Sequence, residues 1–84
     1  MRIRVKLFAS LSDLLPRGVL PHEGFELDID DDTTPAQLIE RLRVPPKLAH
    51  LVLRNGEYIK PEQRDQPVFK DGDVFAVWPP IAGG

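Results

Sequence analysis

The sequence predicts an α+β domain in which one main helix packs on a mixed sheet of four to five strands. Three observations favour this class. Short segments alternate apolar and polar residues with a period of two, one segment has the start signal and apolar stripe of a helix, and an Asn-Gly pair separates two strand-like segments. With 84 residues, the chain has room for one domain with a thin core. The expected order is strand, strand, helix, strand, short strand, strand.

The first two strands are expected over residues 2–8 and 25–30, where apolar residues alternate with charged ones. The charges of the first strand are positive and those of the second are negative. Antiparallel pairing that sets Arg2 against Asp30 and Lys6 against Glu26 would bring opposite charges together, at roughly 0.2–1 kcal/mol per pair. The charge runs therefore have a structural explanation that needs no ligand.

A short helix is predicted between these strands. Residues 10–13, Ser-Leu-Ser-Asp, have the spacing of a capping box, and Pro16 stops the helix after one or two turns. Glycine and proline residues further along indicate a surface loop up to residue 24.

The main helix is predicted to start at Thr34, which would act as the N-cap, with Pro35 at the first helical position and Gln37 able to reach back. The acidic residues 30–32 lie just upstream, where negative charge favours the helix dipole. Pro45 and Pro46 are expected to end the helix. Its apolar stripe consists of Leu38, Ile39 and Leu42.

The second half of the chain is expected to form a hairpin and a final strand. Residues 50–54 and 58–60 flank the Asn55-Gly56 turn, and a polar loop over 61–66 follows. The Asp-Gly-Asp sequence at 71–73 then turns the chain into residues 74–78. This last segment is nearly all apolar, so it is expected to be a central strand covered on both faces.

Composition excludes several classes of protein. The absence of cysteine removes disulfides, thiolate catalysis, iron–sulfur clusters and thiolate zinc sites. A net charge of −2 without a basic cluster argues against nucleic acid as a partner. The longest apolar run, residues 74–82, is too short to span a bilayer, and the charged N-terminal segment is unlike a signal peptide. We therefore expect a cytoplasmic protein with no membrane partner.

The sequence contains no recognisable catalytic or metal-binding constellation. Its glycines form no phosphate-binding loop. His22 and His50 have no ligand-like neighbours, and the acidic residues 30–32 are better explained as a solvated turn before the helix. No metal ion and no bound cofactor are expected.

The C-terminal segment carries the chemistry of this chain. Pro79 and Pro80 prevent the sheet from continuing and hold the exit path extended, so residues 79–84 reach roughly 19 Å at about 3.1 Å each. Gly83 and Gly84 lack Cβ atoms and can enter a narrow channel, which leaves the α-carboxylate as the functional group at the tip. A Gly-Gly end alone is weak evidence, because small terminal residues often fray.

Together these features resemble the ubiquitin-like sulfur carriers, and most closely the small subunits of molybdopterin synthase. The resemblance covers nearly the whole chain, from the opening Val-Lys-Leu-Phe-Ala at 5–9, through Asn55-Gly56 and residues 71–73, to the Pro-Pro-x-x-Gly-Gly ending at 79–84. It implies a β-grasp domain over residues 1–78 and an extended tail over 79–84.

The resemblance also implies a carrier cycle. An activating enzyme of the ubiquitin-activating type would use ATP to adenylate the Gly84 carboxylate, and a persulfide sulfur would replace AMP to leave a thiocarboxylate. As the small subunit of molybdopterin synthase, expected as a heterotetramer, the chain would donate sulfur to cyclic pyranopterin monophosphate inside the large subunit. It would not be an enzyme itself. The alternatives are sulfur donation to thiamine or transfer RNA, a ubiquitin-like modifier joined to lysines, and an interaction module with an inert end.

Partner-binding residues follow from strand parity and from the resemblance. Aromatic residues on an otherwise polar face are typical anchors of an interface. Phe8 and Trp78 could instead cover the end of the core, and Tyr58 could be an ordinary hairpin residue. We favour the interface for Phe8 and Trp78. Beside Gly83 and Gly84 at the reactive end, the predicted contacts are Phe8, Tyr58, Trp78, Pro79, Pro80, Ile81 and Ala82.

Overall fold

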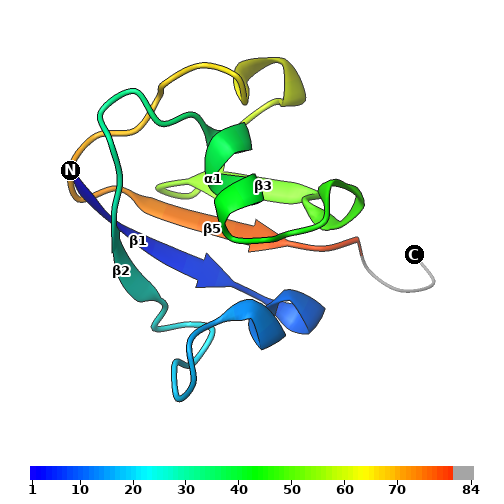
Figure 1. The fold of residues 1–84 in the computed structure, drawn as a ribbon. Coiled ribbons are helices and arrows are strands. Elements are labelled where there is room, and N and C mark those ends of the chain that lie inside the picture. The colour runs from blue at the N-terminus through cyan, green and yellow to red at the C-terminus, as the bar shows by residue number, and fades with distance from the viewer. Residues whose placement is uncertain (81–84) are drawn as a thin grey trace.

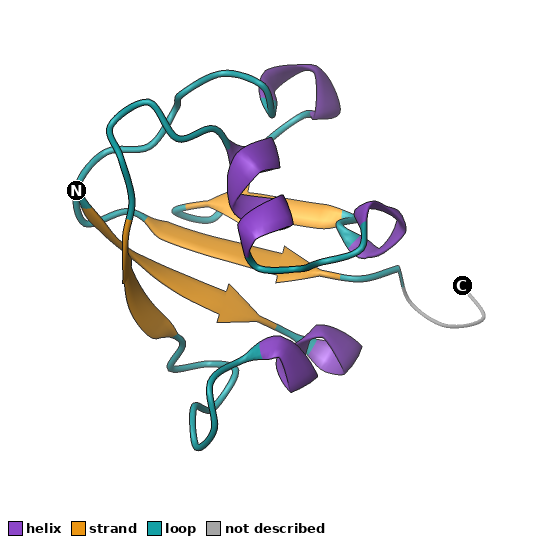
Figure 2. Cartoon of the chain, viewed as in Figure 1, coloured by secondary structure: helices purple, strands orange, loops and turns teal. Residues whose placement is uncertain are grey.

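A computed structural model describes residues 1–80 of the chain. The structure is a five-stranded sheet, and Figures 1 and 2 show the main helix α1 lying across one face of it. The strands lie in the order β2-β1-β5-β3-β4, so the first and last strands are neighbours inside the sheet. The elements are β1 (Arg2–Leu7), η1 (Ala9–Leu14), β2 (Phe25–Asp28), α1 (Pro35–Arg41), η2 (Pro46–Leu48), β3 (Leu51–Arg54), β4 (Glu57–Tyr58), η3 (Pro61–Gln63) and β5 (Val74–Trp78).

The hydrophobic core lies between the sheet and α1. Alternate residues of β1 are fully buried, as the period-two pattern predicts, and α1 contributes Leu38 and Ile39 from its apolar stripe. Phe75 packs edge-on against Phe69, with ring centroids 5.3 Å apart. The α+β class, the mixed sheet and the single main helix are therefore confirmed. The largest fully buried side chains are Phe75, Ile3, Leu7, Leu11, Leu38, Val5, Val52, Val77 and Pro35.

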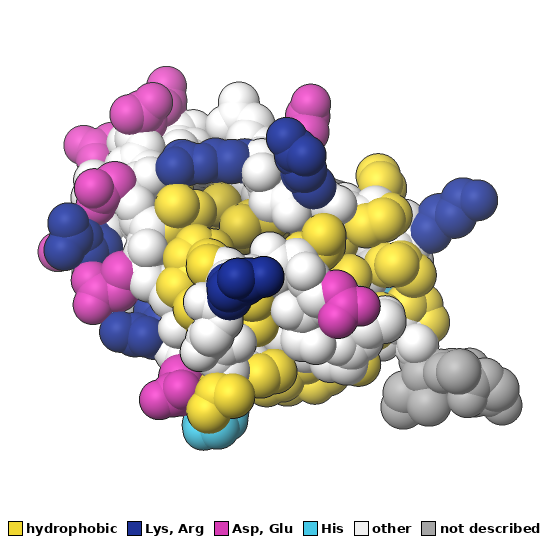
Figure 3. Space-filling view, turned by 60° about the horizontal axis from the view of Figure 1, so that its bottom comes forward, with side chains coloured by type: hydrophobic (Ala, Val, Ile, Leu, Met, Phe, Trp, Pro, Cys, Tyr) yellow, Lys and Arg dark blue, Asp and Glu magenta, His cyan; other side chains and the backbone are white. Residues whose placement is uncertain are grey.

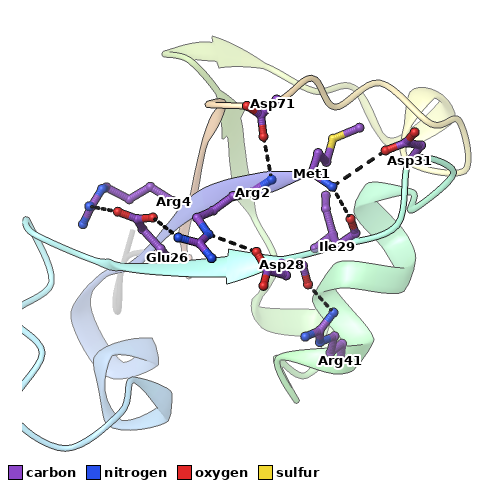
Figure 4. A network of polar contacts seen from close by, with 9 residues as sticks. All are labelled: Met1, Arg2, Arg4, Glu26, Asp28, Ile29, Asp31, Arg41 and Asp71. Carbon is purple, nitrogen blue, oxygen red and sulfur yellow. Dashed lines mark hydrogen bonds and ion pairs between the residues drawn. The ribbon is translucent and has the colours of Figure 1, made fainter.

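The pairing of β1 with β2 is antiparallel, as predicted, but its predicted register is wrong by two residues. Arg2 lies opposite Asp28 and Arg4 opposite Glu26. A shift of two residues keeps every side chain on its predicted face, so opposite charges still meet across the strands. Figure 4 shows the resulting network, in which Arg2 Nε donates to Asp28 at 3.0 Å and Arg4 to Glu26 at 3.2 Å.

The main helix starts as predicted. Thr34 Oγ1 accepts from the backbone N–H of Gln37 at 3.1 Å, and the Gln37 side chain accepts from the Thr34 N–H at 3.0 Å, which completes a capping box. The helix ends at Arg41, before the prolines expected to end it, because Arg43 adopts a left-handed backbone with φ of 63°.

The first short helix forms, but not through its predicted capping box. It is a 3₁₀ helix that begins at Ala9, and Phe8 caps it without a side-chain hydrogen bond. Two further 3₁₀ turns form: η3 lies within the predicted polar loop over 61–66, and η2 begins at Pro46, where no element was predicted. Such turns are too short to give a periodic signal.

The hairpin turn and the last strand match the prediction, but the second hairpin strand is Glu57–Tyr58, one residue earlier and shorter than the predicted 58–60. Asn55 and Gly56 form the turn between β3 and β4 with positive φ angles of 51° and 82°. β5 lies in the middle of the sheet, with Phe75, Ala76 and Val77 buried. Among the described residues, no helix is long and apolar enough to cross a membrane.

Candidate partner-binding surface at the C-terminal exit

The site is built around the place where β5 ends. Because β1 and β5 are parallel, their last residues reach the same edge of the sheet, and the chain leaves the domain there (Figure 1). Phe8 follows β1, and its N–H donates to the carbonyl of Val77 at 3.1 Å. Its ring stacks face to face on Trp78, with centroids 4.0 Å apart and planes 6° from parallel. The topology thus brings together two residues that lie 70 positions apart in the sequence.

A backbone hydrogen bond also fixes the end of β5 on its other side, next to β3. The N–H of His50, just before β3, donates to the carbonyl of Trp78 at 3.2 Å. The next residue, Pro79, is buried, and Pro80 is exposed. The predicted division into a domain over 1–78 and a tail over 79–84 stays a prediction. The predicted contacts Ile81 and Ala82, and the reactive Gly83 and Gly84, lie outside the described residues.

Tyr58 lies on the same sheet face, toward the β4 edge. It is 48% exposed, and the Arg64 guanidinium lies over its ring at 5.8 Å from the centroid. Arg64 is itself fixed, because it donates to the carbonyls of Ile59 and Ala49 at 3.1 Å each. The tyrosine ring therefore lies under a guanidinium that is positioned by two backbone carbonyls from different chain segments.

Strand register connects these aromatic residues through side chains that the sequence-based prediction of contacts missed. Leu51 lies opposite Trp78, while Leu53 lies between Ala76 on one side and Tyr58 on the other. Leu51 is 38% exposed and Leu53 is half-buried. The alternation of residues 50–54 indicated that both leucines share a face, but only the register shows which face it is. Ala76 itself is buried, so we call the set Phe8, Leu51, Leu53, Tyr58 and Trp78 the apolar surface.

The hairpin that carries part of this surface is fastened to β5 by a buried carboxylate. Asp73 is 6% exposed and accepts hydrogen bonds from Arg54 Nε at 2.7 Å, Asn55 Nδ2 at 2.9 Å and the Lys70 N–H at 2.8 Å. Burial opposes ionisation of this carboxyl, but the three hydrogen bonds outweigh burial and lower its pKa. Asp73 is therefore a charged structural anchor, and nothing in its surroundings suggests a catalytic acid.

Charge is distributed unevenly over the molecule. In Figure 3, hydrophobic side chains gather in the middle of the visible face, and most of the visible acidic ones lie on the left. Near the start of β1, Arg2 donates a hydrogen bond to Asp28 and lowers the pKa of that carboxyl.

Within residues 1–80, no group of three or more histidine and acidic side chains is arranged to hold a metal ion. Within the described residues, the apolar surface adjoins the C-terminal exit.

Comparison with known proteins agrees with this geometry. The model of the ThiS family matches residues 5–84. No curated protein matches the chain. Among solved structures, the crystal structure of SAMP1 from Haloferax volcanii is 26% identical with a TM-score of 0.68, and each chain is covered completely.

Two further structures carry molybdopterin-related descriptions. A Pyrococcus furiosus protein described as subunit 1 of a molybdopterin converting factor is 26% identical, with a TM-score of 0.67 over 95% of this chain and 98% of that one. The complex of subunits 1 and 2 of the molybdopterin-converting factor from Helicobacter pylori contains a chain that is 22% identical, with a TM-score of 0.60 and complete coverage of both chains. This last likeness supports the fold alone. The fold is the β-grasp of ubiquitin-like proteins, and with 80 of its 84 residues matched the chain belongs to the ThiS family of ubiquitin-like sulfur carriers.

Proposed function

We propose that this protein carries sulfur on the carboxylate of Gly84 and delivers it as the small subunit of a molybdopterin synthase. The observation that carries the proposal is the Pro-Pro-x-x-Gly-Gly ending, which directly follows a strand whose last residue belongs to an apolar surface. Such a surface suits docking to a partner, and the ending suits entry of the carboxylate into that partner's active site.

The chemistry needs no side chain of this protein. The Gly84 carboxylate attacks the α-phosphate of ATP, pyrophosphate leaves, and the acyl-adenylate becomes a reactive electrophile. A persulfide sulfur of the activating enzyme then attacks the carbonyl carbon, AMP leaves, and a thiol cleaves the resulting S–S bond to release the thiocarboxylate. ATP is a substrate of the activating enzyme in this scheme, so the carrier itself binds no cofactor.

The molybdopterin role is favoured over the other carrier roles by two observations. The paired prolines before the last four residues are the most specific mark of that branch in the sequence. The Pyrococcus furiosus structure, described as a molybdopterin converting factor subunit, is similar over nearly the whole chain. In this role the large subunit supplies the catalytic side chains and binds cyclic pyranopterin monophosphate.

The test is an intact-mass measurement after incubation with the cognate activating enzyme, ATP and a sulfur source. The full chain should gain the mass difference between sulfur and oxygen at its C-terminus. A variant that lacks Gly84 should gain nothing, although its melting temperature should equal that of the full chain. Sulfur transfer by the shortened variant would refute the role of the tail.

A second measurement separates the alternatives. The thiocarboxylated carrier mixed with the large subunit and cyclic pyranopterin monophosphate should lose its sulfur and yield the dithiolene. Lysine adducts of higher mass would instead indicate a protein modifier. Sulfur loading without dithiolene formation would favour thiamine or transfer RNA as the destination, and an unchanged mass would favour an inert interaction module.

A further inference from the structure

The outward face of β1 carries three cationic side chains, which differ in whether an acidic side chain lies beside them. Arg2 pairs with Asp28 at 3.0 Å, and Arg4 pairs with Glu26 at 3.2 Å. Lys6, the next outward residue of the strand, makes no ion pair and no side-chain hydrogen bond with any residue from 1 to 80. Its side chain is half-buried.

The difference arises from what lies across the strand. The antiparallel register sets Val5 against Phe25, so the chain position that continues this ladder beside Lys6 is Gly24. A Cβ atom on Gly24 would lie 2.7 Å from Cγ of Lys6, which places the lysine stem directly over the glycine. A glycine offers no carboxylate, whereas the two preceding cations each face one. On the other side of β1, the register partner of Lys6 is Ala76.

Lys6 therefore stands at the border between two surfaces. Arg2 and Arg4 belong to the charged half of the sheet face, and Phe8, two residues after Lys6, belongs to the apolar surface. The buried Ala76 separates Lys6 from Leu53 in the register. A partner that covers the apolar surface as far as Phe8 comes up to the residue pair next to it on β1, and a partner that also extends over β1 covers Lys6. Removing an unpaired ammonium from water is costly, and the cost is offset only when a carboxylate takes the place of the water.

We propose that Lys6 is a specificity-determining residue of the partner interface and that the partner places an aspartate or glutamate carboxylate against it, at the edge of an apolar patch. This inference rests on the proposed function, in which the large subunit of molybdopterin synthase covers the apolar surface. Like charge at that point of a competing protein would be repelled, so Lys6 selects among partners as well as binding one.

The experiment compares the binding of three variants to the large subunit with that of the wild-type carrier. Lys6→Gln should weaken binding about tenfold, as expected for a lost charge-assisted hydrogen bond, and should flatten the dependence of Kd on salt. Lys6→Glu should weaken it further. Lys70→Gln is the matched control, because it removes the same charge from an exposed position before β5, and it should bind like the wild type.

The outcomes separate the inference from the proposed function. All variants should melt at the wild-type temperature, because Lys6 makes no polar contact within the described domain. If the wild-type carrier binds the large subunit and Lys6→Gln binds it with the same Kd, the inference is overturned and the carrier role stands. A wild-type carrier that loads sulfur at Gly84 but does not bind the large subunit would overturn both the inference and the molybdopterin assignment.

Discussion

Asp73 shows how one side chain can fasten two parts of the sheet. Its carboxylate receives donors from β3, from the turn after β3 and from the loop before β5. The Asn55 side chain completes the junction by accepting from the Val74 N–H at 2.8 Å. Because the carboxylate is buried, water cannot readily replace it as the acceptor for these donors.

Replacement of this carboxylate should reduce stability in a pH-dependent way. Asp73→Asn should lower the free energy of unfolding by about 1–3 kcal/mol at pH 7, because the amide turns a donor toward Arg54 or Asn55. The pKa of Asp73 is lowered in the folded state, so its contribution is present above the ordinary value of 3.8 and is lost as the pH falls through the folded-state pKa. Urea unfolding of both proteins from pH 7 to pH 2 measures the difference between their free energies of unfolding. This difference should disappear at the acid end.

Asp28→Asn provides the control for that measurement. Arg2 lowers the pKa of Asp28 in the same direction, but the Asp28 side chain is 75% exposed. Exposed ion pairs contribute little to the free energy of unfolding, so this variant should be almost as stable as the wild type at every pH. A constant gap between Asp73→Asn and the wild type down to pH 2 would contradict the assigned role of the charge.

Single residues were predictable from the sequence where the signal is local. Thr34 and Gln37 are three positions apart, and their capping box is confirmed. Asp73 was predictable only as a turn residue, because its side-chain partners Arg54 and Asn55 lie 19 and 18 positions away. Lys6 likewise fits the expected cationic strand. That it has no ion-pair partner among residues 1–80 follows only from the register.

At the scale of elements, Gly24 determines how β2 approaches β1. It has a positive φ of 67° and is buried, and a Cβ atom there would lie 2.3 Å from the carbonyl oxygen of Val5. The backbones therefore come close because this residue has no side chain. The sequence marked Gly24 only as part of a loop, and the predicted register did not use it.

Two alanine substitutions should separate backbone strain from close contact. Gly18→Ala should cost about 1 kcal/mol, because Gly18 has a φ of 84° but no atom within 4 Å of the added Cβ. Gly24→Ala should cost about 3 kcal/mol or more, because a clash with the Val5 carbonyl is added to a similar strain. Thermal and urea unfolding measure both values. Equal losses of stability would show that β2 can move away from β1 without cost.

At the scale of the whole molecule, the sheet order explains why the last described residues lie beside the apolar surface. The parallel pair β1 and β5 occupies the interior of the sheet, so the residues that follow both strands emerge together at one edge. The antiparallel partner β3 then extends the apolar surface from Trp78 toward Tyr58. The sequence predicted the elements and the outward faces of Phe8 and Trp78, but the leucines belong to the same surface only because of long-range pairing.

This arrangement predicts that Trp78 matters more for partner binding than for folding. Trp78→Lys should weaken binding to the partner subunit about thirtyfold, because a central aromatic anchor contributes about 2 kcal/mol or more. The free energy of unfolding should fall by only about 1–2 kcal/mol, because the side chain is half-buried and loses mainly its stack on Phe8.

Calorimetric titration and urea unfolding measure the two effects, and Leu20→Lys serves as the control. Leu20 is 51% exposed in the loop between η1 and β2, outside the apolar surface, so its replacement should leave binding unchanged. Trp78→Phe should retain most of the affinity, since the shorter aromatic ring can still stack on Phe8. Loss of the folded state in Trp78→Lys would assign Trp78 to the core, whereas weakened binding of a stably folded variant would make the stacked pair the anchor of a partner-binding surface beside the reactive end.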